Sequence, residues 1–554
     1  MDKKQRMLVV GGVAGGASAA ARARRLCETC EIIVFDKGPF ASFANCGLPY
    51  YVGDVIKREE DLIVASRELF RARFNIDVRT RSEVLSIDRD KRTIEVKDLE
   101  TGRTYREPYT ALVLAPGARP VRPPIPGIDR PGIFVLRTIP DSLRIRAWLR
   151  ERAARQAVVV GGGFIGLEMA ENLARRDLHV TIVELANQIL PPIDAEVAAP
   201  VQDHLKQHGV SLILGEGVAA FEDGADGGLK VRTQKGTTLP ADVVILGVGV
   251  RPEVGLARDA GLELGTSGGI RVDESMRTSD PHIWAVGDAV EVTDIVTGAR
   301  GLVPLAGPAN RQGRIAANSI FRRPAKFRPV QATAVCGIFG LTVATTGAGE
   351  RSLRRAGISG YDKIYLHPGH HAGYYPGAKP IHIKLLFDTK NGRVLGAQAV
   401  GEEGVARRID VIAMAIQKGA TVFDLEEAEL CYAPQFGAAK DPVNLAGMIA
   451  GNVLRGDLSL ANWEEIRSPG GLLLDVREAS EFEQEHIPDA INIPLSELRG
   501  RLEELPADRD IWVYCAVGQR AYYASRLLSQ RGFHAQVLSG GLRTYRSCRS
   551  ILDG

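Results

Sequence analysis

Cysteine is scarce in this sequence, with seven residues among 554. Their spacing does not follow the paired pattern of a disulfide framework, which excludes a small disulfide-rich secreted protein and favours a reducing compartment. The sequence also lacks an apolar run long enough to span a bilayer, and no signal-peptide pattern precedes the first expected strand at Met7. We therefore expect a cytoplasmic protein with no membrane partner.

An excess of charge of either sign is also lacking. The formal net charge is +3, from 70 basic and 67 acidic residues, and this gives no argument for binding nucleic acid. Apolar residues make up 45% and charged residues 25%, which is typical of a globular protein. The length exceeds what one hydrophobic core organises, so we expect several domains.

One cysteine stands alone in a polar stretch. Cys46 lies within Ser42–Tyr50 (SFANCGLPY), and no second cysteine follows at close range. A lone redox-active cysteine must take its sulfur partner from a small molecule or cycle through a sulfenic acid. Gly47 and Pro49 predict a turn that opens a helix, and a helix start would lower the pKa of the Cys46 thiol. A buried, inert cysteine is the alternative.

Cys27, Cys30 and Cys548 lie in no pattern that predicts a redox or metal site. Cys27 and Cys30 form a C-x-x-C at the end of a predicted helix, but neither a second pair nor a helix start beneath the sulfurs accompanies them. We interpret them as packing cysteines, and Cys548 likewise as structural. We expect no metal site.

Two glycine-rich turns between strands predict two dinucleotide-binding units. In the first, the strand Met7–Val10 leads into Gly11–Gly16 (GGVAGG), and the strand Ile32–Phe35 ends at Asp36. Glycines let the backbone approach a pyrophosphate, and an acid about 20 residues on accepts a ribose hydroxyl. Val13 stands where the middle glycine is expected, so a tight turn in a plain α/β domain is the alternative. The candidate site residues are Gly11, Gly12, Gly16 and Asp36.

The second unit has glycine at all of the required places. The strand Val158–Val160 leads into Gly161–Gly166 (GGGFIG), and the strand Val180–Val183 ends at Glu184. The carboxylate of Glu184 would hydrogen-bond an unphosphorylated ribose and repel a 2′-phosphate, which favours NADH over NADPH. Two such units imply two bound dinucleotides. The candidate residues are Gly161, Gly163, Gly166 and Glu184.

Three further strand ends carry candidate cofactor residues. The strand Ala111–Leu114 is followed by Gly117, and the strand Val243–Leu246 exits through Gly249. The third strand closes on Gly287 and Asp288 before an expected helix. Asp288 suits a hydrogen bond to the ribityl chain of a flavin, and the alternative is a helix N-cap.

In chain order, these motifs resemble the two-dinucleotide flavoprotein disulfide reductases. Within them, Ser42–Tyr50 is similar to the branch of coenzyme A-disulfide reductases, NADH-dependent persulfide reductases, NADH oxidases and NADH peroxidases. The resemblance covers residues 7–450. It implies FAD on the first unit, NADH or NADPH on the second, and a dimerisation domain after them.

Three later segments are similar to the coenzyme A-disulfide reductases. They are His367–Gly377, Cys431–Phe436 and Lys440–Asn444. The resemblance implies that Tyr374 and Tyr432 reach the active cysteine of the partner subunit, where a tyrosine hydroxyl can protonate a leaving thiolate. Interface aromatics are the alternative. Phe436 stands where many relatives have a second tyrosine, so a role that needs that hydroxyl is absent.

Coenzyme A carries phosphates, so its site should be locally basic. Arg22 and Arg25 share one face of the first helix by their i, i+3 spacing, although a solvated helix face is the alternative. The relatives often have lysine at the position of Phe74, so one phosphate contact is missing. The resemblance implies a coenzyme A channel lined by Ser18, Arg22, Arg25, Ser42, Asn45, Asn310 and Lys440.

The last 90 residues or so read as a separate small α/β domain. A buried strand at Leu472–Glu478 ends in charges, and a second strand, Ile511–Tyr514, leads to Cys515 and then to Arg520. This pattern resembles a rhodanese domain, with Cys515 and Arg520 closing its active-site loop. Backbone N–H groups of that loop, the helix start and Arg520 would together stabilise a thiolate or a persulfide anion.

The predicted fold is therefore α/β, with two Rossmann-like dinucleotide-binding domains, an α+β dimerisation domain and a small C-terminal α/β rhodanese domain. The expected boundaries are 1–115 with 245–325 for the FAD domain, 116–244 for the NAD(P)H domain, 326–450 for the dimerisation domain, 451–464 for a linker and 465–554 for the rhodanese domain.

The predicted function is NAD(P)H-dependent reduction of coenzyme A persulfide, polysulfide or coenzyme A disulfide through Cys46. The active site would be shared across a homodimer, and Cys515 would deliver or accept sulfane sulfur. An NADH oxidase that uses a Cys46 sulfenic acid is one alternative. Plain coenzyme A-disulfide reduction is another, although it leaves the rhodanese domain unexplained. A redox-sensing or sulfur-relay binding protein is the third.

Overall fold

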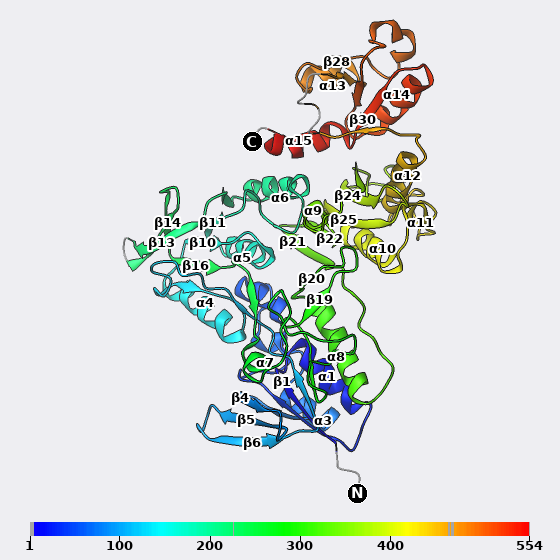
Figure 1. Ribbon diagram of the computed structural model, residues 1–554. Helices are drawn as coiled ribbons and strands as arrows, with labels where there is room; N and C mark the ends of the chain where they lie inside the picture. The colour runs from blue at the N-terminus through cyan, green and yellow to red at the C-terminus, as the bar shows by residue number, and fades with distance from the viewer. Residues whose placement is uncertain (1–4, 225–226, 464–465, 467–469, 553–554) are drawn as a thin grey trace. The chain divides into compact units, whose positions relative to one another are not determined.

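The structure is a computed structural model that describes residues 5–224, 227–463, 466 and 470–552 (Figure 1). The chain divides into two compact units: residues 1–187 with 209–332, and residues 188–208 with 333–554. Among the described residues, every helix is too short or too polar to cross a lipid bilayer.

The first unit contains two parallel five-stranded sheets. The first sheet has the order β18 (Ile283–Ala285), β7 (Ala111–Leu114), β1 (Arg6–Val10), β2 (Glu31–Phe35) and β3 (Asp77–Arg79). The second has the order β12 (Ser211–Leu214), β11 (His179–Glu184), β10 (Gln156–Val160), β16 (Val243–Leu246) and β9 (Ile133–Phe134). Near-continuous burial along β1 and β10 is typical of parallel strands covered on both faces.

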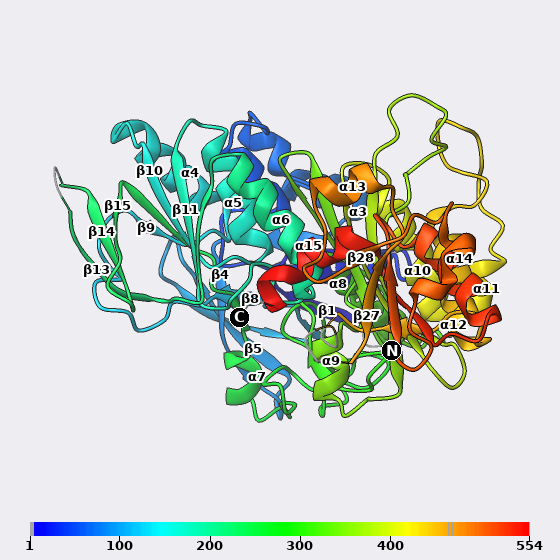
Figure 2. The ribbon, with the colours of Figure 1, turned by 90° about the horizontal axis from the view of Figure 1, so that it is seen from above.

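Each sheet carries an antiparallel three-stranded meander. The meander beside the first sheet is β4 (Ser82–Asp88), β5 (Thr93–Asp98) and β6 (Thr104–Pro108). The meander beside the second sheet is β13 (Val218–Asp223), β14 (Leu229–Thr233) and β15 (Thr238–Ala241), and it extends away from β10 and β11 (Figure 2).

Helices α1 (Ala14–Arg24) and α8 (Ala306–Ile320) pack closely beneath the first glycine-rich turn. A Cβ atom on Gly313 would lie 2.3 Å from the carbonyl oxygen of Gly15, so this approach requires glycine. The remaining elements of the unit are α2 (Leu48–Val52), α3 (Arg67–Phe74), α4 (Ile139–Glu151), α5 (Phe164–Ala174), α7 (Gly255–Asp259), β8 (Ala118–Pro120), β17 (Val250–Pro252), β19 (Glu291–Thr293), β20 (Arg300–Leu302) and the 3-10 turns Asn45–Gly47 and Glu59–Leu62.

A disulfide joins Cys27 and Cys30 in the turn after α1. This corrects the sequence-based interpretation of Cys27 and Cys30 as packing cysteines. The turn places the two Cα atoms 5.6 Å apart, which is a distance that a disulfide spans. Arg24 fixes the turn, because its guanidinium donates to the carbonyls of Cys27, Glu28 and Cys30.

The second unit begins with helix α6 (Ala195–Gln207), which packs against an antiparallel five-stranded sheet. The sheet has the order β21 (Ala334–Ile338), β22 (Leu341–Gly347), β25 (Val394–Gly401), β24 (Ile381–Asp388) and β23 (Tyr361–Leu366). Its helices are α9 (Glu350–Arg355), α10 (Val405–Lys418), α11 (Val422–Glu426) and α12 (Pro442–Leu454).

Lys384 anchors α6 to this sheet. Its fully buried ammonium lies 2.7 Å from an oxygen of Asp194, 2.5 Å from one of Glu350, and also contacts Glu196. The three carboxylates have ligand oxygens within 4.8 Å of one another, so they could hold a metal ion by geometry alone. The lysine already supplies the positive charge at their centre.

A small parallel sheet forms the end of the second unit. Its order is β26 (Leu460–Ala461), β30 (Ala535–Leu538), β29 (Ile511–Tyr514), β27 (Leu472–Asp475) and β28 (Ile491–Asn492), with helices α13 (Ala479–Gln484), α14 (Gln519–Gln530) and α15 (Gly541–Leu552). Two further 3-10 turns lie at Leu498–Gly500 and Leu502–Glu504.

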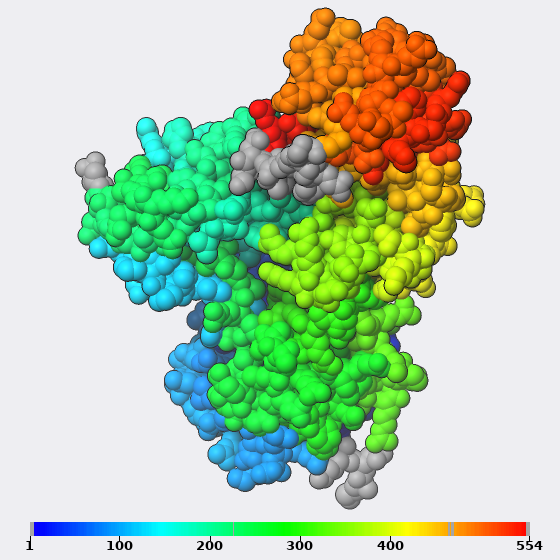
Figure 3. Space-filling view, turned by 45° about the horizontal axis from the view of Figure 1, so that its top comes forward, coloured from blue at the N-terminus to red at the C-terminus, as the bar shows by residue number. Residues whose placement is uncertain are grey.

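The range expected to be a linker, 451–464, contains the last turn of α12 and the strand β26; its residue 464 lies outside the described residues. Hydrogen bonds join the small sheet domain to β23 and to His367, which follows that strand. Figure 3 shows the orange and red surface of this domain lying against the yellow surface of the residues that precede it in the chain. The backbone N–H of Tyr365 donates to the Ser539 hydroxyl at 2.8 Å.

Candidate active site

Cys46 lies in the 3-10 turn before α2, and its side chain is exposed. Desolvation by the surrounding protein raises the pKa of the Cys46 thiol, and the negative charges of Glu168 and Asp288 raise it further. This direction is opposite to the lowering expected from a helix start. The reason is that α2 is only five residues long and begins after Cys46, while burial and the charges of two carboxylates disfavour the thiolate.

Glu168 is a site residue that the sequence analysis missed. It lies on α5, two residues after the last glycine of the second glycine-rich turn, and its Oε1 accepts a hydrogen bond from the Tyr50 hydroxyl at 3.3 Å. Burial, with the charge of Glu171, raises the pKa of Glu168. The second nucleotide unit therefore supplies a carboxyl group to the surroundings of Cys46. Its place beside Gly166 is the signal that could have identified it.

The first glycine-rich turn is built as its sequence predicts. Gly11 has φ +98°, and a Cβ there would lie 2.1 Å from the Ala115 carbonyl oxygen. A Cβ on Gly16 would lie 1.9 Å from the Gly11 carbonyl oxygen. The N–H of Gly12 donates to Asp36 at 2.8 Å. Asp36 thus holds the turn, and its carboxylate has further acceptor capacity for a ribose.

The second turn repeats this arrangement. Gly161 has φ +106°, and a Cβ on Gly166 would lie 2.0 Å from the Gly161 carbonyl oxygen. The N–H of Gly162 donates to Glu184 at 2.6 Å, as Gly12 does to Asp36 in the first turn. A Cβ on Gly163 would meet no protein atom within 4 Å, so the space above this glycine is open. An open cradle at the start of a helix fits a pyrophosphate.

Asp288 lies in a turn after β18, and the next helix, α8, begins only at Ala306. The expected helix after Asp288 is therefore absent, and the N-cap interpretation is wrong. Burial raises the pKa of Asp288, and the positive charge of Arg137 opposes this shift. Burial lowers the pKa of Arg137, which lies among the charges of Asp288, Glu253, Asp36 and Asp141. The sequence analysis missed Arg137, which lies in an irregular segment without a motif.

Three glycines frame this acidic and basic pair. Gly117 has φ +72° and leaves 3.0 Å between a Cβ and Nη2 of Arg137, while Gly249 and Gly287, at φ +95° and +85°, have open space at the Cβ position. The site thus combines the glycine-rich turn at Gly11, the Asp36 and Asp288 carboxyl groups and the half-buried guanidinium of Arg137. This set of donors and acceptors fits the pyrophosphate, ribose and ribityl groups of FAD.

A basic cluster lies on α1 and α8. Burial lowers the pKa of Arg22, and the positive charges of Arg314, Arg25 and Arg323 lower it further, so these arginines lie close enough to repel it. Arg22 Nε donates to the Asn318 amide oxygen at 2.9 Å. This surface suits an anionic ligand, because a bound phosphate would reduce the repulsion among the arginines.

The other channel candidates of the first unit lie near these elements. The Ser18 hydroxyl donates to the Asn310 side-chain oxygen across α1 and α8. Ser42 is buried with φ +50°, and its N–H donates to the Gly12 carbonyl at 2.8 Å. The side-chain amide of Asn45 donates to the Arg137 carbonyl at 3.2 Å. Ser42 and Asn45 therefore connect the Cys46 turn to the first nucleotide turn and to Arg137.

The tyrosines predicted to serve the active cysteine belong to the second unit. Tyr374 and Tyr432 share a hydrogen bond of 2.7 Å between their hydroxyl groups, which raises the pKa of Tyr374. Their side chains are 75% and 50% exposed, and Phe436 is 63% exposed, so this unit presents an aromatic surface. Lys440 is exposed and precedes Asp441, the N-cap of α12.

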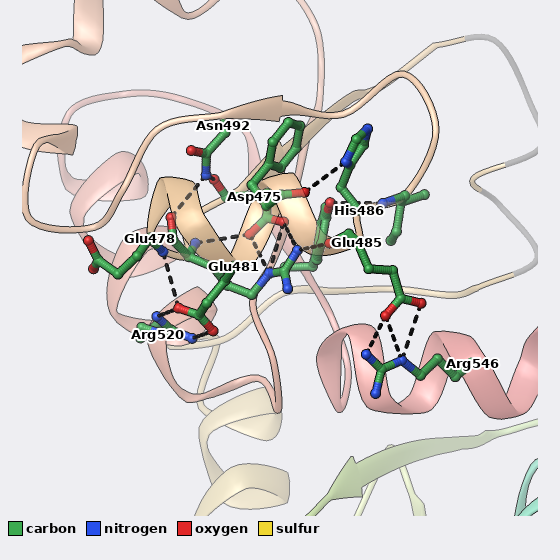
Figure 4. Close-up of polar contacts among 12 residues, drawn as sticks. Asp475, Glu478, Glu481, Glu485, His486, Asn492, Arg520 and Arg546 are labelled. Atoms are coloured by element: carbon green, nitrogen blue, oxygen red, sulfur yellow. Dashed lines mark hydrogen bonds and ion pairs between the residues drawn. The ribbon is translucent and has the colours of Figure 1, made fainter.

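Cys515 directly follows β29, and the residue is buried, with 1% of its surface exposed. The N–H of Gly518 donates to its sulfur at 3.2 Å. Gly541 brings α15 against the loop, since a Cβ there would lie 2.2 Å from the Cys515 carbonyl oxygen. The guanidinium of Arg520 pairs with the Glu481 carboxylate at 2.6 and 2.8 Å (Figure 4).

Comparison with known sequence families gives three matches along the chain. The pyridine nucleotide-disulphide oxidoreductase family matches residues 5–313, its dimerisation domain matches 333–441, and the rhodanese-like domain matches 461–548. An NADH oxidase of Methanocaldococcus jannaschii is 38% identical over 447 residues, which cover 80% of this chain and 97% of that protein. A coenzyme A disulfide reductase of Staphylococcus haemolyticus is 33% identical over 444 residues, covering 80% and 98%.

Two solved structures resemble the whole chain. The reduced CoADR-RHD of Bacillus anthracis is 47% identical with a TM-score of 0.97, covering 99% of each chain. An NAD-dependent persulfide reductase from A. fulgidus is 38% identical with a TM-score of 0.92, covering 98% of this chain and 100% of the other. These matches confirm the predicted fold class, including a dimerisation domain and a C-terminal rhodanese domain.

Proposed function

The chain belongs to the pyridine nucleotide-disulphide oxidoreductase family, whose members use FAD and NADH, and we propose that it reduces coenzyme A persulfide or polysulfide through Cys46. The observation that carries this proposal is the presence in one chain of an unpaired exposed cysteine and a rhodanese loop with its own cysteine. A sulfane-sulfur substrate gives a role to both cysteines, Cys46 and Cys515. Plain coenzyme A-disulfide reduction leaves Cys515 without one.

The cofactor sites would be formed by the residues of the two glycine-rich turns and the strand ends. For FAD they are Gly11, Gly12, Gly16, Asp36, Gly117, Gly249, Gly287 and Asp288. For NADH they are Gly161, Gly163, Gly166 and Glu184. When bound, the flavin would relay two electrons from the nicotinamide to sulfur. The domain ranges proposed for the two cofactors remain 1–115 with 245–325 and 116–244.

At Cys46 the proposed chemistry is thiol exchange. The thiolate attacks the coenzyme A sulfur of CoA–S–SH, so that the S–S bond breaks, HS⁻ leaves with the electron pair, and a Cys46–S–S–CoA mixed disulfide forms. Two electrons from NADH then break this disulfide into the Cys46 thiolate and coenzyme A. The exchange needs a deprotonated sulfur, and the raised pKa of Cys46 makes the removal of its proton a step that the site must assist.

Coenzyme A would lie along the basic surface of Arg22 and Arg25. Ser18, Ser42, Asn45, Asn310 and Lys440 would complete its channel. In a homodimer, Tyr374 and Tyr432 of one subunit would donate a proton to the thiolate that leaves Cys46 of the other. The exposure of both tyrosines and their shared hydrogen bond support a place at a subunit interface. We propose a cytoplasmic location, where coenzyme A thiols are available.

A second candidate function is NADH oxidation by oxygen, favoured by the 38% identity with an NADH oxidase. Cys46 would then cycle through a sulfenic acid. A passive redox sensor is less well supported, because a complete NADH site has no purpose in it.

The test is single-turnover release of sulfide from coenzyme A persulfide by the NADH-reduced enzyme. The Cys46→Ser variant should release none, whereas Cys431→Ser, which removes another exposed cysteine, should match the parent. Undiminished release by Cys46→Ser would refute the proposal. Oxygen consumption that exceeds persulfide turnover would favour the oxidase.

A further inference from the structure

The arginine of the rhodanese loop, Arg520, is paired with a carboxylate that no motif assigns. Glu481 on α13 accepts both hydrogen bonds from Arg520 that the structure shows, at 2.6 and 2.8 Å. These bonds dominate the rise in the pKa of Arg520, and the neighbouring charge of Cys515 adds to it. Arg520 thus stands beside the reactive sulfur with its charge already balanced.

Glu481 is itself held in place by its own helix. Its Oε2 accepts the Glu478 N–H at 3.2 Å, within the capping box of α13. The charge of Arg477 also favours the ionised form, and Arg477 is fixed by a buried bidentate pair with Asp475. The carboxylate therefore stands in a set position before any substrate arrives.

The arginines around this helix follow one pattern. Arg477 pairs with Asp475. Arg520 pairs with Glu481, and Arg546 with Glu485, as Figure 4 shows. A sulfur donor that carries a second anionic group close to its sulfane sulfur, such as thiosulfate, needs uncompensated positive charge near the loop. These pairs withhold it, because each carboxylate neutralises the guanidinium that it contacts.

We infer that Glu481 determines the specificity of the Cys515 site, by admitting alkyl persulfides whose reacting end carries no further charge and disfavouring thiosulfate. The reaction is Cys515–S⁻ + R–S–SH → Cys515–S–SH + R–S⁻. The bond between the two donor sulfurs breaks, a bond from Cys515 to the outer sulfur forms, the proton stays on that sulfur, and the electron pair leaves with R–S⁻.

This inference rests on the proposed function only in that Cys515 handles sulfane sulfur. It can be tested apart from flavin chemistry in the full-length holoenzyme carrying Cys46→Ser, without NADH. The readout is the rate at which Cys515 gains one sulfur atom, followed by mass spectrometry, with pantetheine persulfide and with thiosulfate as the two probes.

The decisive quantity is the ratio of the two rate constants, since the probes differ in intrinsic reactivity. Glu481→Gln should shift the ratio toward thiosulfate by about tenfold, and more at low salt. The reason is that Arg520 loses the carboxylate that balances its charge, so its positive charge becomes available to the anion. Glu483→Gln, an exposed position on the same helix, should leave the ratio unchanged. An equal loss with both probes would show a purely structural role for Glu481 and overturn the inference, as would an unchanged ratio.

Discussion

Nε2 of His367 lies 2.8 Å from Oγ1 of Thr544, so the last helix of the rhodanese domain is hydrogen-bonded to the dimerisation domain. The His367 ring also meets the His382 ring, with centroids 4.7 Å apart, and its Nδ1 is buried without a hydrogen-bond partner among the described residues. Burial lowers the pKa of His367, with contributions from His382 and Arg543. Burial and Arg543 lower the pKa of His382 to about 4. Both rings are therefore neutral at pH 7.

This histidine pair predicts a loss of stability in mild acid. Because both pKa values are lower in the folded than in the unfolded chain, the unfolded state takes up protons first as pH falls. The contribution of the two histidines to the free energy of unfolding should be fully present above pH 6.5, the ordinary pKa of histidine. It should decline as the pH falls toward about 4. Glu196 and Tyr365 also face these rings, but the lowered pKa of Glu196 and the raised pKa of Tyr365 keep both from titrating in this window.

Urea unfolding followed by tryptophan fluorescence at pH 7 and pH 5 measures this effect. His382→Phe should reduce the difference between the two midpoints, whereas His486→Gln, at an exposed histidine, should preserve it. Identical midpoints at both pH values in the parent protein would contradict the prediction.

Lys384→Met should destabilise the second unit by about 3–5 kcal/mol, because it leaves buried carboxylates without their cation. The affected groups are Asp194, Glu196 and Glu350. Thermal unfolding measures the change. Lys390→Met, at an exposed lysine, should cost less than about 0.5 kcal/mol. Similar losses for the two variants would show that the buried cluster contributes little.

Two glycines of the second glycine-rich turn should respond differently to alanine. Gly161→Ala places a Cβ 2.5 Å from the Gly247 carbonyl oxygen at φ +106°, so we expect a loss of folding stability of about 1–3 kcal/mol. Gly163→Ala meets no protein atom, so stability should hold while KM for NADH rises. Unfolding curves and steady-state kinetics separate the two effects. An unchanged KM in Gly163→Ala would argue that the pyrophosphate lies elsewhere.

Removing the charge of Glu168 should lower the pKa of Cys46, since that charge raises it. The rate of iodoacetamide alkylation against pH, measured in a Cys431→Ser background, gives the midpoint directly. Glu168→Gln should move the midpoint to lower pH, and Glu151→Gln, at an exposed glutamate, should not. A shift to higher pH would show that Glu168 acts on Cys46 in another way, for instance through Tyr50.

The Cys27–Cys30 disulfide closes a short loop, with a sequence separation of 3. In the chain-entropy description, a loop this short contributes about 2 kcal/mol at most. The double substitution Cys27→Ser with Cys30→Ser should therefore lower Tm only slightly, and dithiothreitol should have no further effect on it. Arg24→Ala should lower Tm more, because it frees several buried backbone carbonyls. A larger loss of Tm in the double cysteine variant than in Arg24→Ala would show that the disulfide contributes more than Arg24 to the stability of this turn.

Local signals in the sequence predicted the strands and the backbone of the two glycine-rich turns. Strand periodicity, glycine spacing and the terminal acids at Asp36 and Glu184 are all read within about 25 residues, the length of one βαβ unit. The structure adds the backbone hydrogen bonds of both acids to the turns that they follow.

Contacts between distant segments could not be predicted in this way. Glu168 meets Tyr50 across 118 positions, and Lys384 meets Asp194 across 190. A pattern argument has no access to such pairs, since they depend on how the sheets fold. The prediction of a helix after Asp288 was wrong for a related reason, because an acidic residue after a buried strand is equally compatible with a turn.

Helix α6 comes from the middle of the sequence, yet it folds with the C-terminal unit. Asp194 and Glu196 therefore depend on a lysine that lies far along the chain. A chimera that grafts residues 333–554 of this protein onto a relative would have to bring residues 188–208 with them. Otherwise the donor lysine would meet a foreign helix, and only recipients with matching acids would accept the graft.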